Sequence, residues 1–196
     1  EAQGRRRPDH RGAVRQAVRL LGEQFVLGST IESALSRARD FEEKGYRFSY
    51  DMLGEAARSE RDAERYFQRY MAAIDAVGNA APPFTATNVD AIFERPSISV
   101  KLSALHPRFE PGKEHRLHAE LAPRLLTLAR AARAKGLGLT VDAEEQDRLD
   151  ITAGMFGEML VNPQLDNWNG LGLAVQAYGK RAIPLIRWLR RLSEQT

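Results

Sequence analysis

Residues 137–149, LGLTVDAEEQDRL, join a short apolar run to a cluster of acids. The run is rich in the residue types of a buried β-strand, and Asp142 follows it directly. Glu144 and Glu145 come close behind, and such crowding is unfavourable unless a cation lies nearby or the carboxylates have a function. The stretch therefore predicts a buried strand over 137–143 whose acid near the carboxyl end has either a cationic partner or a function.

Three further runs resemble this strand. YRFSYDML (46–53) is rich in aromatic residues, and two others are almost continuously apolar: SISVKLSAL (97–105) and LGLAVQAY (171–178). Continuous apolar character is typical of parallel strands that helices cover on both faces. The sequence therefore predicts an α/β protein with a parallel sheet.

Amphipathic segments alternate with these runs and predict helices. A lead helix begins after Ser29, which has capping-box spacing with Glu32, and ends before Gly45. The later helices cover Ser59 to Gly78, about 117–135 with a kink or fresh start at Pro123, about 144–160, and a last segment with Pro184 in its first turn. Residues 80–96 are expected to form a loop. The chain thus predicts a lead helix and four strand–helix units.

The last three strands each carry a polar residue near the carboxyl end: Lys101, Asp142 and Gln176. Ligands bind at this end of parallel sheets, because the strand-to-helix loops open there. A structural alternative remains open, in which Lys101 and Asp142 form an ion pair that fixes strand register and Gln176 caps a turn.

Two α/β folds fit the alternation. An open doubly wound sheet is one, although YDMLGEAARSE (50–60) lacks a glycine-rich phosphate-binding fingerprint. A (β/α)8 TIM-type barrel is the other, and it needs about 250 residues. The 196 residues would then supply roughly its first half.

Composition excludes several classes of function. The absence of cysteine excludes disulfides and thiolate chemistry, and we predict no metal site. The 29 basic and 26 acidic residues are interleaved, which disfavours nucleic-acid binding. Arg5-Arg6-Arg7 is expected to be a disordered tail. No stretch approaches the roughly 18 apolar residues of a membrane span, so we expect a cytoplasmic protein.

Five segments in order resemble the proline dehydrogenase domain of the bifunctional proline utilization A flavoenzymes. They are GEQFVLG (22–28), YDMLGEAA (50–57), SVKLSALHPRF (99–109), VDAEEQDRL (141–149) and WNGLGLAVQAYGKR (168–181). The resemblance implies a (β/α)8 barrel that binds FAD and oxidises L-proline to Δ1-pyrroline-5-carboxylate. It divides the chain into a tail and lead helix (1–44) and the first half of a barrel (45–196).

The same resemblance implies roles for individual residues. Lys101 would lie near the substrate carboxylate, and Asp142 between substrate and flavin. Ala143 would contact the flavin through its backbone, Gln176 would hydrogen-bond the isoalloxazine ring, and Tyr178 would lie close by. It also implies a quinone electron acceptor and peripheral contact with the inner face of the membrane, and we expect that the chain forms homo-oligomers.

The family's later arginines and its Lys-Gly-Ala-Tyr segment do not occur in this sequence. We therefore expect a partial catalytic domain that is inactive alone. A non-catalytic half-barrel scaffold is the main alternative, and an aldolase with Lys101 as the Schiff-base lysine is a weaker one. For the opening stretch we predict that Asp142 is functional, with Lys101 as counter-charge, and that Glu144 and Glu145 open the third helix. A structural role remains open for the two glutamates, in which they pair with Arg148 or Arg181.

Overall fold

The computed structural model describes residues 14, 22, 26–54, 56–85 and 89–194, and the chain divides into two units, Glu1–Tyr46 and Arg47–Thr196. The Arg5–Arg7 segment, for which a disordered tail is predicted, lies outside the described residues. The lead helix of the first unit is α2 (Ile31–Glu42).

The cap of α2 differs from the prediction by one position. Thr30, not Ser29, is the N-cap: its backbone is extended, and its hydroxyl accepts a hydrogen bond from the Ser33 N–H at 3.2 Å. The Ser33 hydroxyl in turn accepts from the Thr30 N–H at 3.1 Å. The capping box is therefore formed by two hydroxyl residues, and Glu32 is not its partner.

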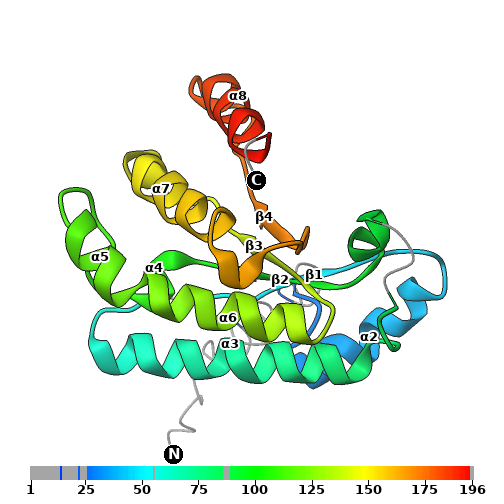
Figure 1. Cartoon of the computed structure of the whole chain (residues 1–196). Helices are drawn as coiled ribbons and strands as arrows, with labels where there is room; N and C mark the ends of the chain where they lie inside the picture. The colour runs from blue at the N-terminus through cyan, green and yellow to red at the C-terminus, as the bar shows by residue number, and fades with distance from the viewer. Residues whose placement is uncertain (1–13, 15–21, 23–25, 55, 86–88, 195–196) are drawn as a thin grey trace, which may run out of the picture. The chain divides into compact units, whose positions relative to one another are not determined.

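In the described part of the second unit, four strands form one parallel sheet in the order β1-β2-β3-β4 (Figure 1). Their bounds are β1 (Ser49–Asp51), β2 (Ser97–Val100), β3 (Gly138–Val141) and β4 (Leu171–Leu173). The register pairs Asp51 with Ser99 and Val100 with Val141. Strand order follows chain order without the reversal that marks a doubly wound sheet.

The second unit carries these helices: α3 (Glu60–Ala80), α4 (Leu102–Leu105), α5 (Glu114–Glu120), α6 (Ala122–Ala134), α7 (Leu149–Leu160) and α8 (Ala182–Ser193). Short 3-10 segments are η1 (Val89–Glu94), η2 (Gln146–Arg148) and η3 (Pro163–Leu165). Helices α3 and α6 run side by side, and α7 contacts α6 (Figure 1). Among the described helices, none is both long and apolar enough to cross a membrane.

The core lies between these helices and the strands. Tyr70 and Ile74 of α3, Leu125 and Leu128 of α6, and Leu139 of β3 are fully buried. Burial of each such aliphatic side chain contributes about 1.5–3 kcal/mol. The alternation of strands and amphipathic helices predicted from the sequence is therefore confirmed.

Two predicted helix boundaries are confirmed. The Ser59 hydroxyl caps α3 by accepting from the Asp62 N–H at 3.2 Å, and its contact with the Asp62 carboxylate lowers the pKa of that acid. Pro123 lies in the first turn of α6, so the expected fresh start is correct: α5 ends at Glu120, and Leu121 separates the two helices.

Every strand is shorter than its apolar run. The run 97–105 is strand only to Val100, and Leu102–Leu105 form the buried helical turn α4. The runs 46–53, 137–143 and 171–178 likewise keep three, four and three strand residues. The residues of α4 are buried, as strand residues would be, so their composition gave no sign that the strand ends at Val100. Residues 80–96, expected to be a loop, contain η1.

Arg95 fixes the turn that leads into β3. Its Nε donates to the Gly136 carbonyl at 2.9 Å, its Nη1 donates to the Pro82 carbonyl at 2.6 Å, and its guanidinium lies 5.4 Å from the Phe84 ring centroid. Burial lowers its pKa. Gly136 has φ +63°, and an added Cβ would meet the Phe84 side chain at 2.5 Å, so glycine is required there.

Candidate functional site

Three charged side chains meet at the carboxyl end of the sheet. Asp51 ends β1, Lys101 follows β2, and Asp142 follows β3. The Lys101 Nζ lies 3.0 and 2.9 Å from the two Asp51 carboxylate oxygens and 2.7 Å from Asp142 Oδ2. Their side chains are 25%, 33% and 26% exposed for Lys101, Asp51 and Asp142, so the cluster is shielded yet open to a ligand.

The predicted contact between Lys101 and Asp142 is thus confirmed, but Asp51 was missed. The predicted strand 46–53 ran two residues past Asp51, which hid its position at a strand end. The signal was present, because an acid in an aromatic, apolar run follows the same pattern as Asp142. Among the described residues, these three side chains place two carboxylates on one ammonium, which gives the three together a net negative charge.

The backbone of Lys101 is held firmly. Its N–H donates to the hydroxyl of buried Tyr70 at 3.1 Å. The turn α4 follows at once, and its Ser103 carbonyl accepts from the Ala57 N–H at 2.9 Å. Arg124 Nη1 donates to the Leu105 carbonyl at 2.8 Å. Lys101 therefore projects from a buried turn that α3, α6 and the loop after β1 all contact.

Glu144 and Glu145 do not open α7, so that prediction is wrong; Glu145 is the N-cap position of the 3-10 segment η2, and the alternative prediction of a pairing with Arg148 is confirmed. Both lie before η2, and α7 begins only at Leu149. The Glu144 side chain is 7% exposed, accepts from the Ser103 N–H at 3.0 Å, and pairs with Arg148 at 3.2 Å. The Glu145 side chain is 67% exposed and pairs with Arg148 at 3.3 Å. The sequence could not separate them, since adjacent acids in a loop have no periodicity.

Gln176 lies in the loop after β4 rather than on the strand. Its Nε2 donates to the Glu144 carbonyl at 3.2 Å, and its Oε1 receives a long bond, 3.4 Å, from Gln146. The side chain therefore joins the loops after β3 and β4 and does not cap its own turn. A small cavity between these loops is lined by residues that include Ala143, Ala174 and Gln176. Tyr178 is 85% exposed.

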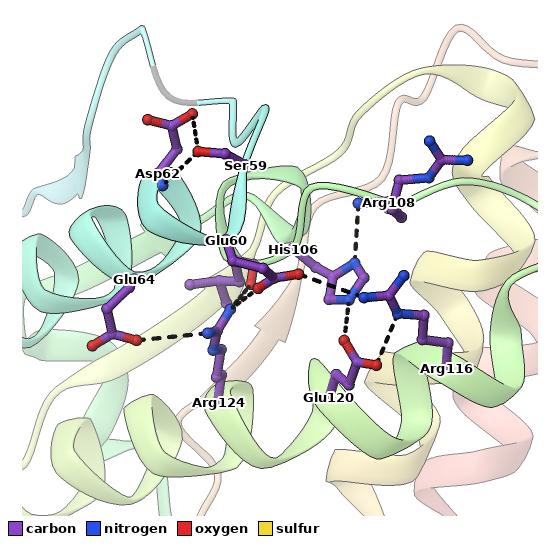
Figure 2. Close-up of polar contacts among 10 residues, drawn as sticks. Ser59, Glu60, Asp62, Glu64, His106, Arg108, Arg116, Glu120 and Arg124 are labelled. Carbon is purple, nitrogen blue, oxygen red and sulfur yellow. Dashed lines mark hydrogen bonds and ion pairs between the residues drawn. The ribbon is translucent and has the colours of Figure 1, made fainter.

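A second polar cluster lies beside α4, around His106 (Figure 2). His106 is 1% exposed; its Nδ1 accepts from the Arg108 N–H at 3.1 Å, so its Nε2 carries the proton and donates to Glu120 at 3.1 Å. Arg116 Nε also donates to Glu120 at 2.8 Å. Arg116 first and His106 second lower the pKa of Glu120 to about 2.

Three residues of this cluster could hold a metal ion, because ligand atoms of Glu60, His106 and Glu120 lie within 4.8 Å of one another. Glu60, however, pairs with Arg116 at 3.6 Å and with Arg124 at 3.7 Å (Figure 2). A cation would have to displace these guanidinium groups from the carboxylates. We therefore interpret the cluster as a structural network that joins the loop after α4 to α3, α5 and α6.

Comparison with known proteins gives this geometry a context. The family whose sequence profile matches is described as proline dehydrogenase, over residues 34–196. The bifunctional protein PutA of Salmonella typhimurium is 47% identical over 186 residues, which are 95% of this chain and 14% of that protein. This chain therefore spans about a seventh of the length of that relative.

Solved structures agree. A mutant of proline utilization A from Bradyrhizobium japonicum matches with a TM-score of 0.75 and 48% identity, covering 94% of this chain and 18% of that one. Proline utilization A from Bdellovibrio bacteriovorus, inactivated by N-propargylglycine, matches with a TM-score of 0.85 at 24% identity, covering 94% and 20%; that likeness shows the fold alone. By the profile match, which covers residues 34–196, the chain belongs to the proline dehydrogenase family.

Proposed function

We propose that the protein containing this chain oxidises L-proline to Δ1-pyrroline-5-carboxylate, with FAD as the electron acceptor. The cluster of Asp51, Lys101 and Asp142 is the observation that carries this proposal. Family membership and the names of the relatives agree with it.

The cluster suits an amino acid whose amine is to be oxidised. Proline enters as a zwitterion, so its carboxylate would face the Lys101 ammonium and its amine would face a carboxylate. One ammonium shared between two carboxylates leaves negative charge to attract the substrate's cationic nitrogen. In the reaction a hydride leaves the ring carbon next to nitrogen and a proton leaves the nitrogen, and Asp142 would hold that proton. The chain's contribution is to orient the ring and to manage charge.

The residues around the small cavity fit a flavin. Ala143 presents a small side chain and a backbone, and the Gln176 Oε1 is engaged by only a 3.4 Å bond from Gln146, so it keeps capacity to accept from a ring N–H. Asp142, Ala143 and Gln176 would hold the isoalloxazine ring, with exposed Tyr178 beside it. When bound, FAD supplies the hydride acceptor.

The second unit would form the first half of a (β/α)8 barrel. Strand order in chain sequence supports this, as do the half-buried residues of β4, which a further strand would cover. Residues 1–44 would be the tail and lead helix. The resemblance further supports a quinone as final acceptor, a cytoplasmic location with peripheral membrane contact, and homo-oligomers.

The test uses the complete protein that contains this chain. Purified protein should carry FAD and oxidise L-proline, and the variant D142N should lose most turnover while the exposed-site control D147N keeps it. Protein without flavin or proline oxidation would instead support the scaffold alternative. Equal turnover in D142N and D147N would remove Asp142 from the proposed chemistry.

A further inference from the structure

Glu144 contacts the elements that carry Lys101, Asp142 and Gln176. It belongs to the loop after β3, two residues beyond Asp142. Its carboxylate accepts from the Ser103 N–H at 3.0 Å, in the turn that begins next to Lys101. Its backbone carbonyl accepts from Gln176 Nε2 at 3.2 Å. One residue thus joins the loops that follow β2, β3 and β4.

The bond to Ser103 matters because α4 is short. In a helical turn of four residues the first N–H groups have no acceptor within the helix. The Glu144 carboxylate supplies the acceptor for one of them, the Ser103 N–H. The Glu144 side chain is 7% exposed, and Arg148 compensates its charge at 3.2 Å. A carboxylate buried in this way is held in one place, and so is the turn that it binds.

We propose that Glu144 is a positioning residue, which sets Lys101 relative to Asp142 and Gln176 through its hydrogen bond to the Ser103 amide. The inference rests on the proposed function of these three residues. It assigns no contact with substrate or flavin to Glu144 itself.

Reach and charge can be separated at this position. E144Q keeps the length and an acceptor oxygen for the Ser103 N–H but loses the charge that faces Arg148. E144D keeps the charge but is one methylene shorter, so it withdraws from the amide. A role in positioning predicts that glutamine is the better substitute, whereas simple neutralisation of Arg148 predicts aspartate.

Glu145 supplies a matched control. It is the adjacent acid and pairs with the same Arg148 at 3.3 Å, but its side chain is 67% exposed. E145Q and E145D therefore make the same chemical changes at an acid that lacks the buried hydrogen bond to Ser103. Surface changes of this kind alter free energies by less than about 0.5 kcal/mol, or about twofold in a rate.

The experiment measures FAD per chain, the flavin absorption spectrum, and kcat and KM for L-proline per bound FAD in the complete protein. A displacement of about 1 Å costs about a hundredfold in rate, so E144D should lose about that much kcat/KM, with a raised KM and an altered flavin spectrum. E144Q should stay within about tenfold of the wild type, since a neutral acceptor bonds about half as strongly as a charged one. The Glu145 variants should match the wild type.

The opposite order, with E144D equal to or better than E144Q, would overturn the inference, as would Glu144 variants that behave like their Glu145 counterparts. Normalisation to bound FAD removes any loss of folded protein from the comparison. A wild-type protein without flavin or proline oxidation would defeat the proposed function, whereas an active wild type with the wrong order defeats the positioning role alone.

Discussion

Removal of the Lys101 ammonium should leave two carboxylates facing each other. The Nζ lies 2.9 Å from Asp51 Oδ2 and 2.7 Å from Asp142 Oδ2, so these two oxygens are at most 5.6 Å apart. At an effective dielectric constant of about 20, two charges at that distance repel by about 3 kcal/mol. The partial exposure of both acids screens this repulsion, so K101M should destabilise the domain by about 1–3 kcal/mol.

The informative comparison is a double-mutant cycle. If repulsion dominates, D51N added to K101M should restore most of the lost stability, although D51N alone removes an ion pair and should be mildly destabilising. Thermal and urea unfolding of the complete protein, followed by far-UV circular dichroism, measure both. K135M is the control, because Lys135 pairs with exposed Asp75 at 3.3 Å and such surface pairs contribute about 0–1 kcal/mol.

A K101M/D51N protein no more stable than K101M would refute this account of the cluster. Additive effects of K101M and D51N would mean that Lys101 and Asp51 are not energetically coupled. Turnover should be lost in both variants, so stability is the quantity that decides.

Three further predictions concern the scaffold. The pKa of Glu120 is about 2 against an ordinary 4.5, so this carboxylate stabilises the fold fully above about pH 4.5 and progressively less as pH falls toward 2. The difference in unfolding free energy between the wild type and E120Q, measured by urea unfolding, should therefore become smaller from pH 6 to pH 3. G136A should cost more than G112A in melting experiments, because both glycines have positive φ, worth about 1–2 kcal/mol, but only at Gly136 does the new Cβ also meet Phe84; equal losses would show that the contact relaxes freely. R95M removes the donors to two carbonyls and should destabilise by about 1–3 kcal/mol in the same assay, and a neutral result would mean that water replaces the guanidinium.

The sequence was most informative where periodicity and spacing act together. Alternating runs specified the parallel sheet, and the position of Lys101 and Asp142 at the ends of successive runs predicted their contact. Parallel neighbours bring equivalent ends to the same edge, so such a contact follows from strand order alone.

Tertiary packing decided what the sequence could not. All four residues of α4 are buried and three of them are apolar, and the same residue types fit a strand equally well. Asp51 was hidden by an overlong predicted strand, and Glu144 is distinguished from Glu145 by burial and by its hydrogen bond from a backbone amide 41 residues away in the chain. Non-local contacts of this kind leave no local pattern.

The separation of the charged residues along the chain also orders the assembly of the site. Asp51 and Lys101 are 50 residues apart, and a complete helix, α3, lies between them. Asp51 is synthesised first, so its pairing with Lys101 has to wait until β2 has been added to the chain. β3 follows later in the chain and adds Asp142, which makes the net charge of these three side chains negative. Among the described residues, β1 and β2 alone would therefore hold a balanced pair, and the proposed attraction for a cationic amine would need the third strand.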